Sequence, residues 1–540
     1  MSLKKIYDTF ANPTSRLFCS FLLIAFLLFP VFAGVAQEPS NASTAPSAKI
    51  EDCDGDGLKD ASIETSYVRV IVSGKTGSPA LLHLKGRNFD ENIYPPVIQD
   101  FGYKIASETL KAFSGEIYGV SLSGSGYTVE LEEKTAEKIV VRATANVSLP
   151  AAEMPANAAV LATSPVLSLI VRYTFYADSY HFAVEHVVSN LQERLVTVGN
   201  EQNGSLSLNF GPGVFMDPFG PSTILALKPG VAEAHTDVKA LNAAGFVTGA
   251  FKGIGLRDQY FCVILESESP ARISASAFEI DSTDEKRKKQ TGNVISCSLP
   301  AFNLGAKESR AFTYKVYAGP IILDQLKKHD LEQVSEYGFL STMLLRVLQF
   351  FYNLFPNYGL AIVLLTLVVR LALYPLTLKQ TKSMAQMQKI QPKVQDLKDR
   401  YKDNPQKFNE EVLKLYQKSN VNPLGGCLPL LLQLPILIAL YNTIRIAVEL
   451  RKTPFLWISD LSKGDPLLIL PIAIAALMYY QQGKMTDPQQ QQMMAFMPMF
   501  MFVITWSLPA GLLVYWFASS VIGLLQQFQA NRIAAAIKEE

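Results

Sequence analysis

The residues with the clearest chemical potential stand inside an apolar stretch, Gly359 to Leu376. Eighteen residues at a rise of 1.5 Å extend about 27 Å, which is close to the thickness of the hydrocarbon core of a membrane. The stretch contains a cation, Arg370, and a charge near the centre of such a helix costs about 2.5–3.5 kcal/mol. Thr366 and Tyr374 stand four residues before and after Arg370, so the three side chains share one face. The pattern predicts a polar stripe on a membrane-spanning helix.

Two interpretations of Arg370 are open. In the first, the guanidinium reaches the nearer membrane surface while its stem covers apolar side chains. In the second, which we favour, the stripe lines a wet groove where an unpaired cation attracts polar groups of a ligand. No Asp or Glu stands within the apolar stretches, and Asp465 lies only at the edge of one. The sequence therefore offers Arg370 no carboxylate partner inside the membrane.

The rest of the 540 residues carry no pattern of catalytic or metal-binding chemistry. There are five histidines, no cluster of His and Cys at ligand spacing and no phosphate-binding loop. We predict no catalytic residue, no metal and no cofactor, hence a protein that is not an enzyme. The acidic segment 52–60 imitates the start of a calcium loop, but Ile63 occupies the position of the last ligand, so we interpret the segment as an acidic turn.

The N-terminal segment 1–36 has basic residues followed by an apolar run that ends in small residues, which indicates an export signal. Its length suits a cleaved signal peptide and a retained membrane anchor equally. Residues 37–61 begin with a stretch rich in Pro, Ala and Ser, which predicts a linker.

Residues 62–319 form the second large part of the chain, and short runs with alternating or β-branched residues recur through them. This pattern predicts a large two-sheet β sandwich, exported by the segment before it. Cys262 and Cys297 fall in two of these runs, and a disulfide between them is expected if the strands are neighbours.

The rear of the chain predicts a membrane bundle. Residues 324–356 contain an amphipathic segment that suits a helix in the membrane interface, although a short core helix is the alternative. The segment 379–419 contains ten Lys and Arg and predicts a cytoplasmic helical hairpin with its turn at 403–405. Four further apolar runs follow, so that residues 357–530 hold five spans, and 531–540 is a short cytoplasmic tail. The runs are Leu424–Tyr441, Leu467–Gln482, Met493–Leu508 and Gly511–Leu525.

Several motifs in this region carry a resemblance to a known family. They run in the same order as in the YidC-type membrane protein insertases, from about residue 324 to 532. The motifs are VRLALYPLTLKQ at 369–380, MAQM at 384–387, QPK at 391–393, VNPLGGC at 421–427, the segment 429–441, DP at 465–466, TDP at 486–488, FMP at 496–498 and PAGL at 509–512. The exported β region and the N-terminal span resemble the layout of the diderm bacterial branch of that family.

The resemblance implies a five-helix core around a groove that opens to the cytoplasm and to lipid, where one arginine attracts polar substrate segments. Arg370 matches that arginine. Thr366, Gln433, Tyr515 and Trp516 match positions that line the groove in the family, and the basic hairpin matches the element that receives substrates. The tail 530–540 lacks the long basic extension of some members, so it gives no support to ribosome docking.

We therefore expect a multi-domain protein of the bacterial inner membrane that inserts and folds nascent integral membrane proteins. The bilayer, the Sec translocon and the ribosome are the partners that the resemblance implies, and the balance of 49 basic and 48 acidic residues gives no support to specific nucleic-acid binding. The alternative function is a small-solute secondary transporter, which also has polar residues near the membrane midplane. The lack of an intramembrane carboxylate for ion coupling argues against it.

Overall fold

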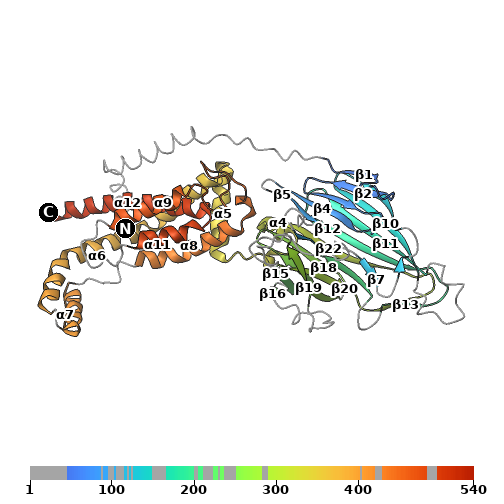
Figure 1. The fold of residues 1–540 in the computed structure, drawn as a ribbon, viewed down its shortest axis with the longest axis horizontal. Helices are drawn as coiled ribbons and strands as arrows, with labels where there is room; N and C mark the ends of the chain where they lie inside the picture. Colours follow the sequence, from blue (N-terminus) through green and yellow to red (C-terminus); the bar gives the residue numbers. More distant parts are fainter. Residues whose placement is uncertain are drawn as a thin grey trace, which may run out of the picture. The chain divides into compact units, whose positions relative to one another are not determined.

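A computed structural model describes most of the chain from residue 45 onward. The described residues are 45–86, 89–94, 103–104, 115–117, 121–122, 126–148, 166–199, 205–210, 223–228, 231–235, 251–269, 271–282, 290–401, 404–419, 428–482 and 496–539. The predicted N-terminal span 1–36 lies outside them. The chain divides into two compact units (Figure 1), a β unit at 39–336 and a helical unit that contains 337–540, and each is treated by itself below.

The largest sheet of the β unit has ten antiparallel strands, in the order β16-β15-β17-β18-β22-β12-β11-β10-β8 with β9 beside β10. Strands β11 and β12 alternate strictly between buried and half-buried residues, as the period-2 pattern of the sequence predicts. The strands are β8 (Ser121–Leu122), β9 (Thr128–Lys134), β10 (Lys138–Ser148), β11 (Leu167–Tyr176), β12 (His181–Asn190), β15 (Thr223–Lys228), β16 (Val231–His235), β17 (Gly253–Arg257), β18 (Phe261–Ser267) and β22 (Ser309–Pro320).

Two five-stranded sheets and a two-stranded ribbon complete this unit. The predicted two-sheet sandwich is therefore too simple, although sheets do pack face to face where β17 and β18 contact β20. One sheet holds β1 (Ser47–Glu51), β2 (Asp60–Glu64), β3 (Val68–Val72), β4 (Pro79–Gly86) and β5 (Phe89–Tyr94); another holds β6 (Tyr103–Lys104), β7 (Gly115–Ile117), β14 (Leu206–Phe210), β19 (Arg272–Ser282) and β20 (Gln290–Ser298); the ribbon pairs β13 (Val196–Val198) with β21 (Phe302–Leu304).

The predicted linker 37–61 is wrong in its second half, because β1 and β2 pair as an antiparallel hairpin within it and beyond it. The acidic turn joins the two strands. Asp52 accepts hydrogen bonds from the backbone N–H groups of Gly55 and Gly57, at 2.7 and 3.0 Å, and the buried Asp60 accepts from Cys53 and Gly74. These carboxylates thus close a turn, the role that the sequence predicted for them.

The expected Cys262–Cys297 disulfide is also wrong. Both cysteines are buried free thiols, Cys262 on β18 of the ten-stranded sheet and Cys297 on β20 of a five-stranded sheet. Their strands belong to different sheets and touch only across the sandwich, so the condition that they be neighbours in one sheet fails.

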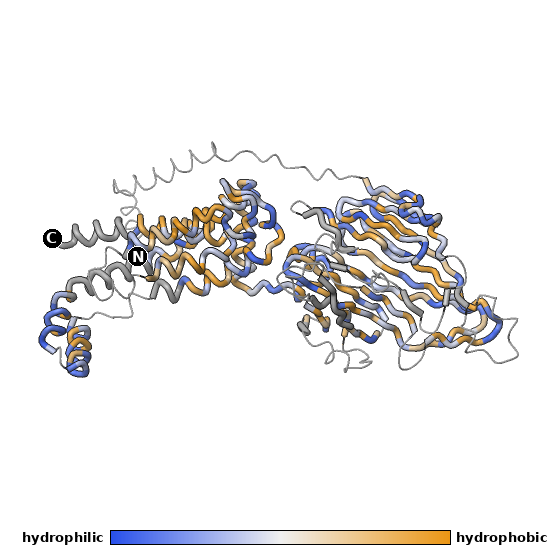
Figure 2. Tube along the Cα trace, in the orientation of Figure 1, coloured by the Kyte–Doolittle hydropathy of each residue, from blue (hydrophilic) through white to orange (hydrophobic). Residues whose placement is uncertain are grey.

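The β unit ends in two short helices, α4 (Leu323–Lys328) and η4 (Glu332–Val334), and the helical unit follows. Its elements are α5 (Phe339–Leu354), α6 (Tyr358–Arg400), α7 (Pro405–Lys418), α8 (Leu428–Ile446), η6 (Val448–Leu450), α9 (Ile469–Gln482), α11 (Met497–Trp506) and α12 (Ala510–Glu539). Figure 2 shows α9 and α11 as almost unbroken apolar segments, whereas the strands of the β unit alternate.

Helix α5 buries one face and exposes the other. Leu344, Leu345 and Leu348 are buried, whereas Phe339 and Phe350 are 89 % and 63 % exposed. The Ser341 hydroxyl donates to the carbonyl of Ala439 in α8 at 3.1 Å. The segment is therefore a helix with large apolar side chains on its exposed face, which agrees with the predicted interfacial helix better than with a short core helix.

Helix α6 differs from the prediction of a span followed by a separate helix near Pro392. It runs without interruption for 43 residues and contains both Pro375 and Pro392. The predicted turn of the hairpin is confirmed at its second helix, because Asn404 caps α7 by accepting from Lys407 N–H at 3.1 Å and Pro405 occupies the first turn. The hairpin thus consists of the C-terminal part of α6 and of α7, which follows it after a short turn.

The other predicted spans keep their places but not all their lengths. Among the described residues, Tyr358–Pro375 alone is long and apolar enough to cross a membrane, while Phe339–Leu354, Ile469–Gln481, Met497–Trp506 and Ala510–Gln526 are apolar and shorter. The predicted tail 531–540 is helical as far as Glu539, as the last part of α12.

Candidate functional site: a polar seam between helices

Arg370 lies where α6 packs along α12, the largest contact between helices in this unit. Its Nε donates a hydrogen bond to the hydroxyl oxygen of Ser519 on α12 at 2.8 Å. Ser519 is 3 % exposed, so this bond is shielded from bulk water. The cation is therefore held by a neutral hydroxyl on another helix and not by a carboxylate.

Gly523 makes room for the guanidinium one turn further along α12. A Cβ atom at this position would lie 3.4 Å from Nη1 and 3.5 Å from Cζ and Nη2 of Arg370. These are ordinary van der Waals distances, so an alanine would fit here and only a side chain that extends beyond Cβ would crowd the guanidinium. Gly523 thus lets α12 lie close to the cation.

A second polar pair continues the contact from α12 to α8. The amide Nε2 of Gln433 on α8 donates to the hydroxyl of Tyr515 on α12. Tyr515 is 2 % exposed and lies four residues before Ser519, on the same face of α12. We call Arg370, Gln433, Tyr515, Ser519 and Gly523 the polar seam.

The other predicted site residues stand differently. Thr366 is fully buried, but its hydroxyl donates to the carbonyl of Ile362 in its own helix at 2.7 Å, so its donor is already used. Tyr374 follows Arg370 on the same face and is partly exposed. Trp516 is partly exposed, and it points about 100° around α12 from Tyr515. The structure thus brings Arg370, Gln433 and Tyr515 into one network, with Thr366 as packing beside it.

Sequence reasoning missed Ser519 and Gly523. The available signal was their spacing, since Tyr515, Ser519 and Gly523 recur every four residues and so share one face of α12. Gln526, 4 % exposed, extends the same face by nearly one more turn. The last helix carries a polar and small-residue stripe of its own, which meets the stripe on α6.

Acidic residues of the described chain do not neutralise the seam. Among the ion pairs of the described residues none involves Arg370. Asp465 is occupied elsewhere: it accepts from the indole N–H of Trp457 at 3.0 Å and from the backbone N–H of Leu470 in the first turn of α9 at 2.7 Å. The seam is therefore a cationic site with neutral walls.

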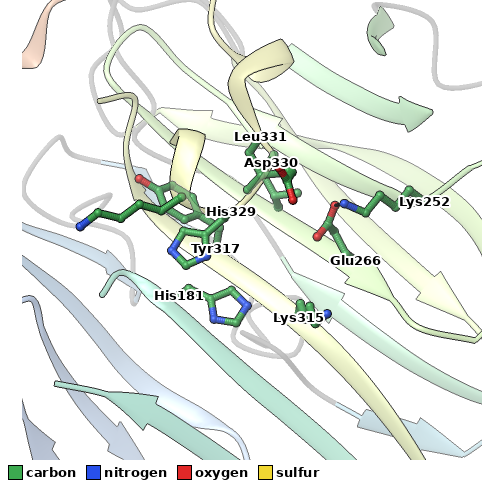
Figure 3. A pocket seen from close by; sticks show the side chains of 10 residues that line it. His181, Lys252, Glu266, Lys315, Tyr317, His329, Asp330 and Leu331 are labelled. Carbon is green, nitrogen blue, oxygen red and sulfur yellow. Dashed lines mark ion pairs between the residues drawn. The ribbon is translucent and has the colours of Figure 1, made fainter. Parts of the chain in front are cut away.

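The β unit contains a polar crevice of about 240 Å³ (Figure 3). The stacked imidazoles of His181 and His329, with ring centroids 4.8 Å apart, join β12 to the segment after α4. Its buried carboxylate, Glu266, lies 3.0 Å from Lys252, and Lys315 pairs with Glu268 at the same distance. The charges of the crevice thus neutralise one another, and its visible role is to attach the segment after α4 to the sheet.

A β-rich unit followed by apolar helices with a partly buried cation between two of them defines a class, namely a membrane protein with a polar site between its helices. The comparisons with known proteins identify the class further. Residues 350–538 match the family model described as "60Kd inner membrane protein", and residues 161–350 match the YidC periplasmic domain.

Relatives of known function agree with these matches. The membrane protein insertase YidC of Geobacter sulfurreducens is 35 % identical over 373 residues, which are 67 % of each chain. That of Aeromonas salmonicida is 44 % identical over 245 residues, 43 % of this chain and 44 % of the relative. A crystal structure of an active YidC insertase covers 94 % of this chain and 98 % of its own, with 18 % identity and a TM-score of 0.37. The chain belongs to the YidC family of membrane protein insertases.

Proposed function

We propose that this protein inserts nascent integral membrane proteins into the bacterial inner membrane, and that the polar seam is where a substrate segment enters. The observation that carries the proposal is the geometry of Arg370, a partly buried cation whose hydrogen-bonded partner is the neutral Ser519. A cation with neutral walls retains an attraction for an incoming negative or polar group, which a buried ion pair would already have satisfied.

The seam lowers the barrier for a short hydrophilic segment by offering it hydrogen-bonding groups and one charge part-way across the membrane. Without such groups an isolated polar group in hydrocarbon costs several kcal/mol. The apolar helices that follow the segment then leave sideways. Met499 and Val503 on α11 are 75 % and 61 % exposed, so that this helix presents an apolar outer face to lipid.

We place the β unit in the periplasm and the hairpin of α7 with the end of α6 in the cytoplasm, on the strength of the charge distribution. The five-helix membrane core is then formed by α6, α8, α9, α11 and α12, with α5 in the outer interface. α9 and α11 have 14 and 10 residues, below the about 17 that a bilayer of ordinary thickness requires, which supports a thinned membrane beside them. The Sec translocon and the ribosome stay predictions of the family resemblance.

The test is site-specific crosslinking from residues 366, 433 and 516 during translation of a single-span membrane protein. A nascent chain captured from Thr366 and Gln433, which lie on or beside the seam, supports the proposal. Capture of a small solute instead, with no nascent chain, would favour a secondary transporter. Labelling of cysteines introduced at 379–419 from the outside would invert the proposed topology.

A further inference from the structure

We infer that Ser519 is a positioning residue for insertion: it fixes Arg370 by Nε so that the two Nη groups are presented to the substrate. This inference rests on the function proposed above and adds to it a second residue that decides which substrate segments are accepted. Ser519 itself need not touch the substrate.

The first step is the use of the guanidinium edges. An arginine has five N–H donors in a planar fork, one on Nε and two on each Nη. Ser519 occupies the single Nε donor, and it is the one side-chain hydrogen bond of Arg370 among the described residues. The Nη edge, which matches a carboxylate in a bidentate manner, is thereby kept for an incoming group.

The second step is that the side chain of Arg370 must be fixed in one orientation by a neighbouring group. A free arginine side chain has several rotatable bonds, and their freedom is lost on binding unless the side chain is fixed beforehand. The hydroxyl of Ser519 fixes it, and Gly523 clears the space beside Nη1 and Nη2. The holder is a hydroxyl and not a carboxylate, so the cation is oriented without being neutralised.

The third step is that Ser519 is itself held. It is buried on α12, one turn from the buried Tyr515, whose hydroxyl accepts from Gln433 on α8. The Ser519 hydroxyl can accept from Arg370 and still donate elsewhere, because a serine offers one donor and two lone pairs. The buried position of Ser519 thus fixes the direction of the guanidinium.

The chemistry of the preferred substrate follows from this arrangement. A translocated segment with an Asp or Glu side chain gains from a fixed Nη edge, whereas a segment with neutral polar side chains gains little. Replacing Ser519 should therefore slow the insertion of substrates with acidic translocated segments and have little effect on substrates with neutral ones.

The experiment uses the full-length protein in proteoliposomes and measures insertion of two single-span substrates that differ only in Asp or Asn in the translocated segment. We expect Ser519→Ala to slow the Asp substrate about fivefold and to leave the Asn substrate within about twofold, since it removes a hydrogen bond to a charged group. Ser519→Thr, which keeps the hydroxyl, should restore the Asp substrate. Ser520→Ala, the same change one residue further along α12, is the matched control and should slow neither substrate.

A double variant separates positioning from packing. In an Arg370→Ala background, Ser519→Ala should add no further loss, because Ser519 acts through the guanidinium. Gly523→Val, which displaces the guanidinium while keeping the hydroxyl, should reproduce the defect of Ser519→Ala.

Three results would overturn the inference in distinguishable ways. If Ser519→Ala slows both substrates equally while Arg370→Ala is selective for Asp, Ser519 is structural. If Ser519→Ala has no effect while Arg370→Ala is selective for the Asp substrate, the proposed function of the polar seam is supported and the positioning role of Ser519 is contradicted. If Arg370→Ala is not selective at all, the electrostatic function of the seam fails, and the inference fails with it.

Discussion

The β unit and the helical unit distribute polar and apolar residues in opposite ways. In the β unit the apolar side chains are inside and the ion pairs are outside, as in Arg172, which is bound by Glu132 and Glu185 at 2.9 Å each on the sheet surface. In the helical unit Arg370 and Ser519 are inside, while Val503 and Met499 are exposed. The distribution of polar and apolar residues thus suits the β unit to water and the helical unit to lipid.

The largest difference between the two units should appear when an exposed apolar residue is replaced by Asp at one position in each unit, with the two positions equally exposed. Val503 on α11 is 61 % exposed and Leu195 in the β unit is 63 % exposed. We expect Val503→Asp to cost about 2.5–3.5 kcal/mol, because a carboxylate would then face hydrocarbon. Leu195→Asp should stay within about 0.5 kcal/mol, because water already covers that position.

The measurement is the fraction of each variant that resists protease after graded heating of native membranes. Equal losses for the two variants would show that the exposed face of α11 meets water, and the proposed arrangement of the helical unit would then be wrong.

The second effect is a loss of stability at low pH. It should affect the β unit alone, since all five histidines stand between residues 83 and 329. His186 is fully buried against Tyr314, and burial lowers the pKa of its imidazole to about 4. The unfolded chain, with an ordinary histidine pKa near 6.5, binds the proton first. Stability from this group is therefore complete above about pH 6.5 and falls as the pH drops, by about 2 kcal/mol at pH 5 and about 3 kcal/mol at pH 4.

Urea unfolding of the β unit, followed by its far-ultraviolet circular dichroism at pH 7 and pH 5, measures this effect. His186→Phe keeps the ring packing and should reduce the difference between the two pH values. Part of the difference should persist, because burial also lowers the pKa of His181 to about 4. An unchanged pH dependence in the variant would show that His186 does not titrate in this range.

The third effect is on transport itself. Arg370→Ala should slow insertion of a substrate with an acidic translocated segment about tenfold, or about 1.4 kcal/mol, and hardly affect a neutral one. Arg370→Lys should fall between wild type and Ala, since it keeps a point charge but cannot present a bidentate edge. A loss that is equal for both substrates would indicate that Arg370 only anchors its helix.

The smallest effect is expected from the thiols of the β unit. Cys262 and Cys297 are buried, and burial raises the pKa of the Cys297 thiol to about 12, so neither should react with maleimide in the folded protein. Cys53 is exposed and should react first. Peptide mapping before and after unfolding in urea checks this order, and a Cys262–Cys297 peptide found without reductant would restore the disulfide that the structure lacks.

The sequence revealed those features that repeat within one element. The stripe around Arg370, the alternation of β11 and β12 and the helix that begins at Pro405 after the predicted turn are all local patterns, and the structure contains each of them. The role of Ser519 is different, because its partner is 149 residues away and one serine in an apolar helix gives no sign of which helix it meets. Long-range contacts, not local preferences, decide that role.

Two errors came from residues whose local preference was overruled. Pro392 commonly begins a helix, yet a proline removes only one backbone hydrogen bond, and α6 continues through it. The stretch before Asp52 has the composition of a linker, but Ser47–Glu51 becomes a strand because β2 offers it a partner edge. The strand at Ser47–Glu51 is thus determined by its pairing with β2 and not by its own composition.

The long helix α6 has a mechanical consequence. Pro375 lies five residues beyond Arg370 and leaves the carbonyl of Leu371 without its helical hydrogen bond, a natural hinge. Beyond the hinge, the 25 residues to Arg400 form an arm about 38 Å long. A swing of 10° would carry the tip of that arm about 7 Å while the segment before Pro375 stays still. Bending at Pro375 would therefore move α7 over several ångströms without changing the position of Arg370.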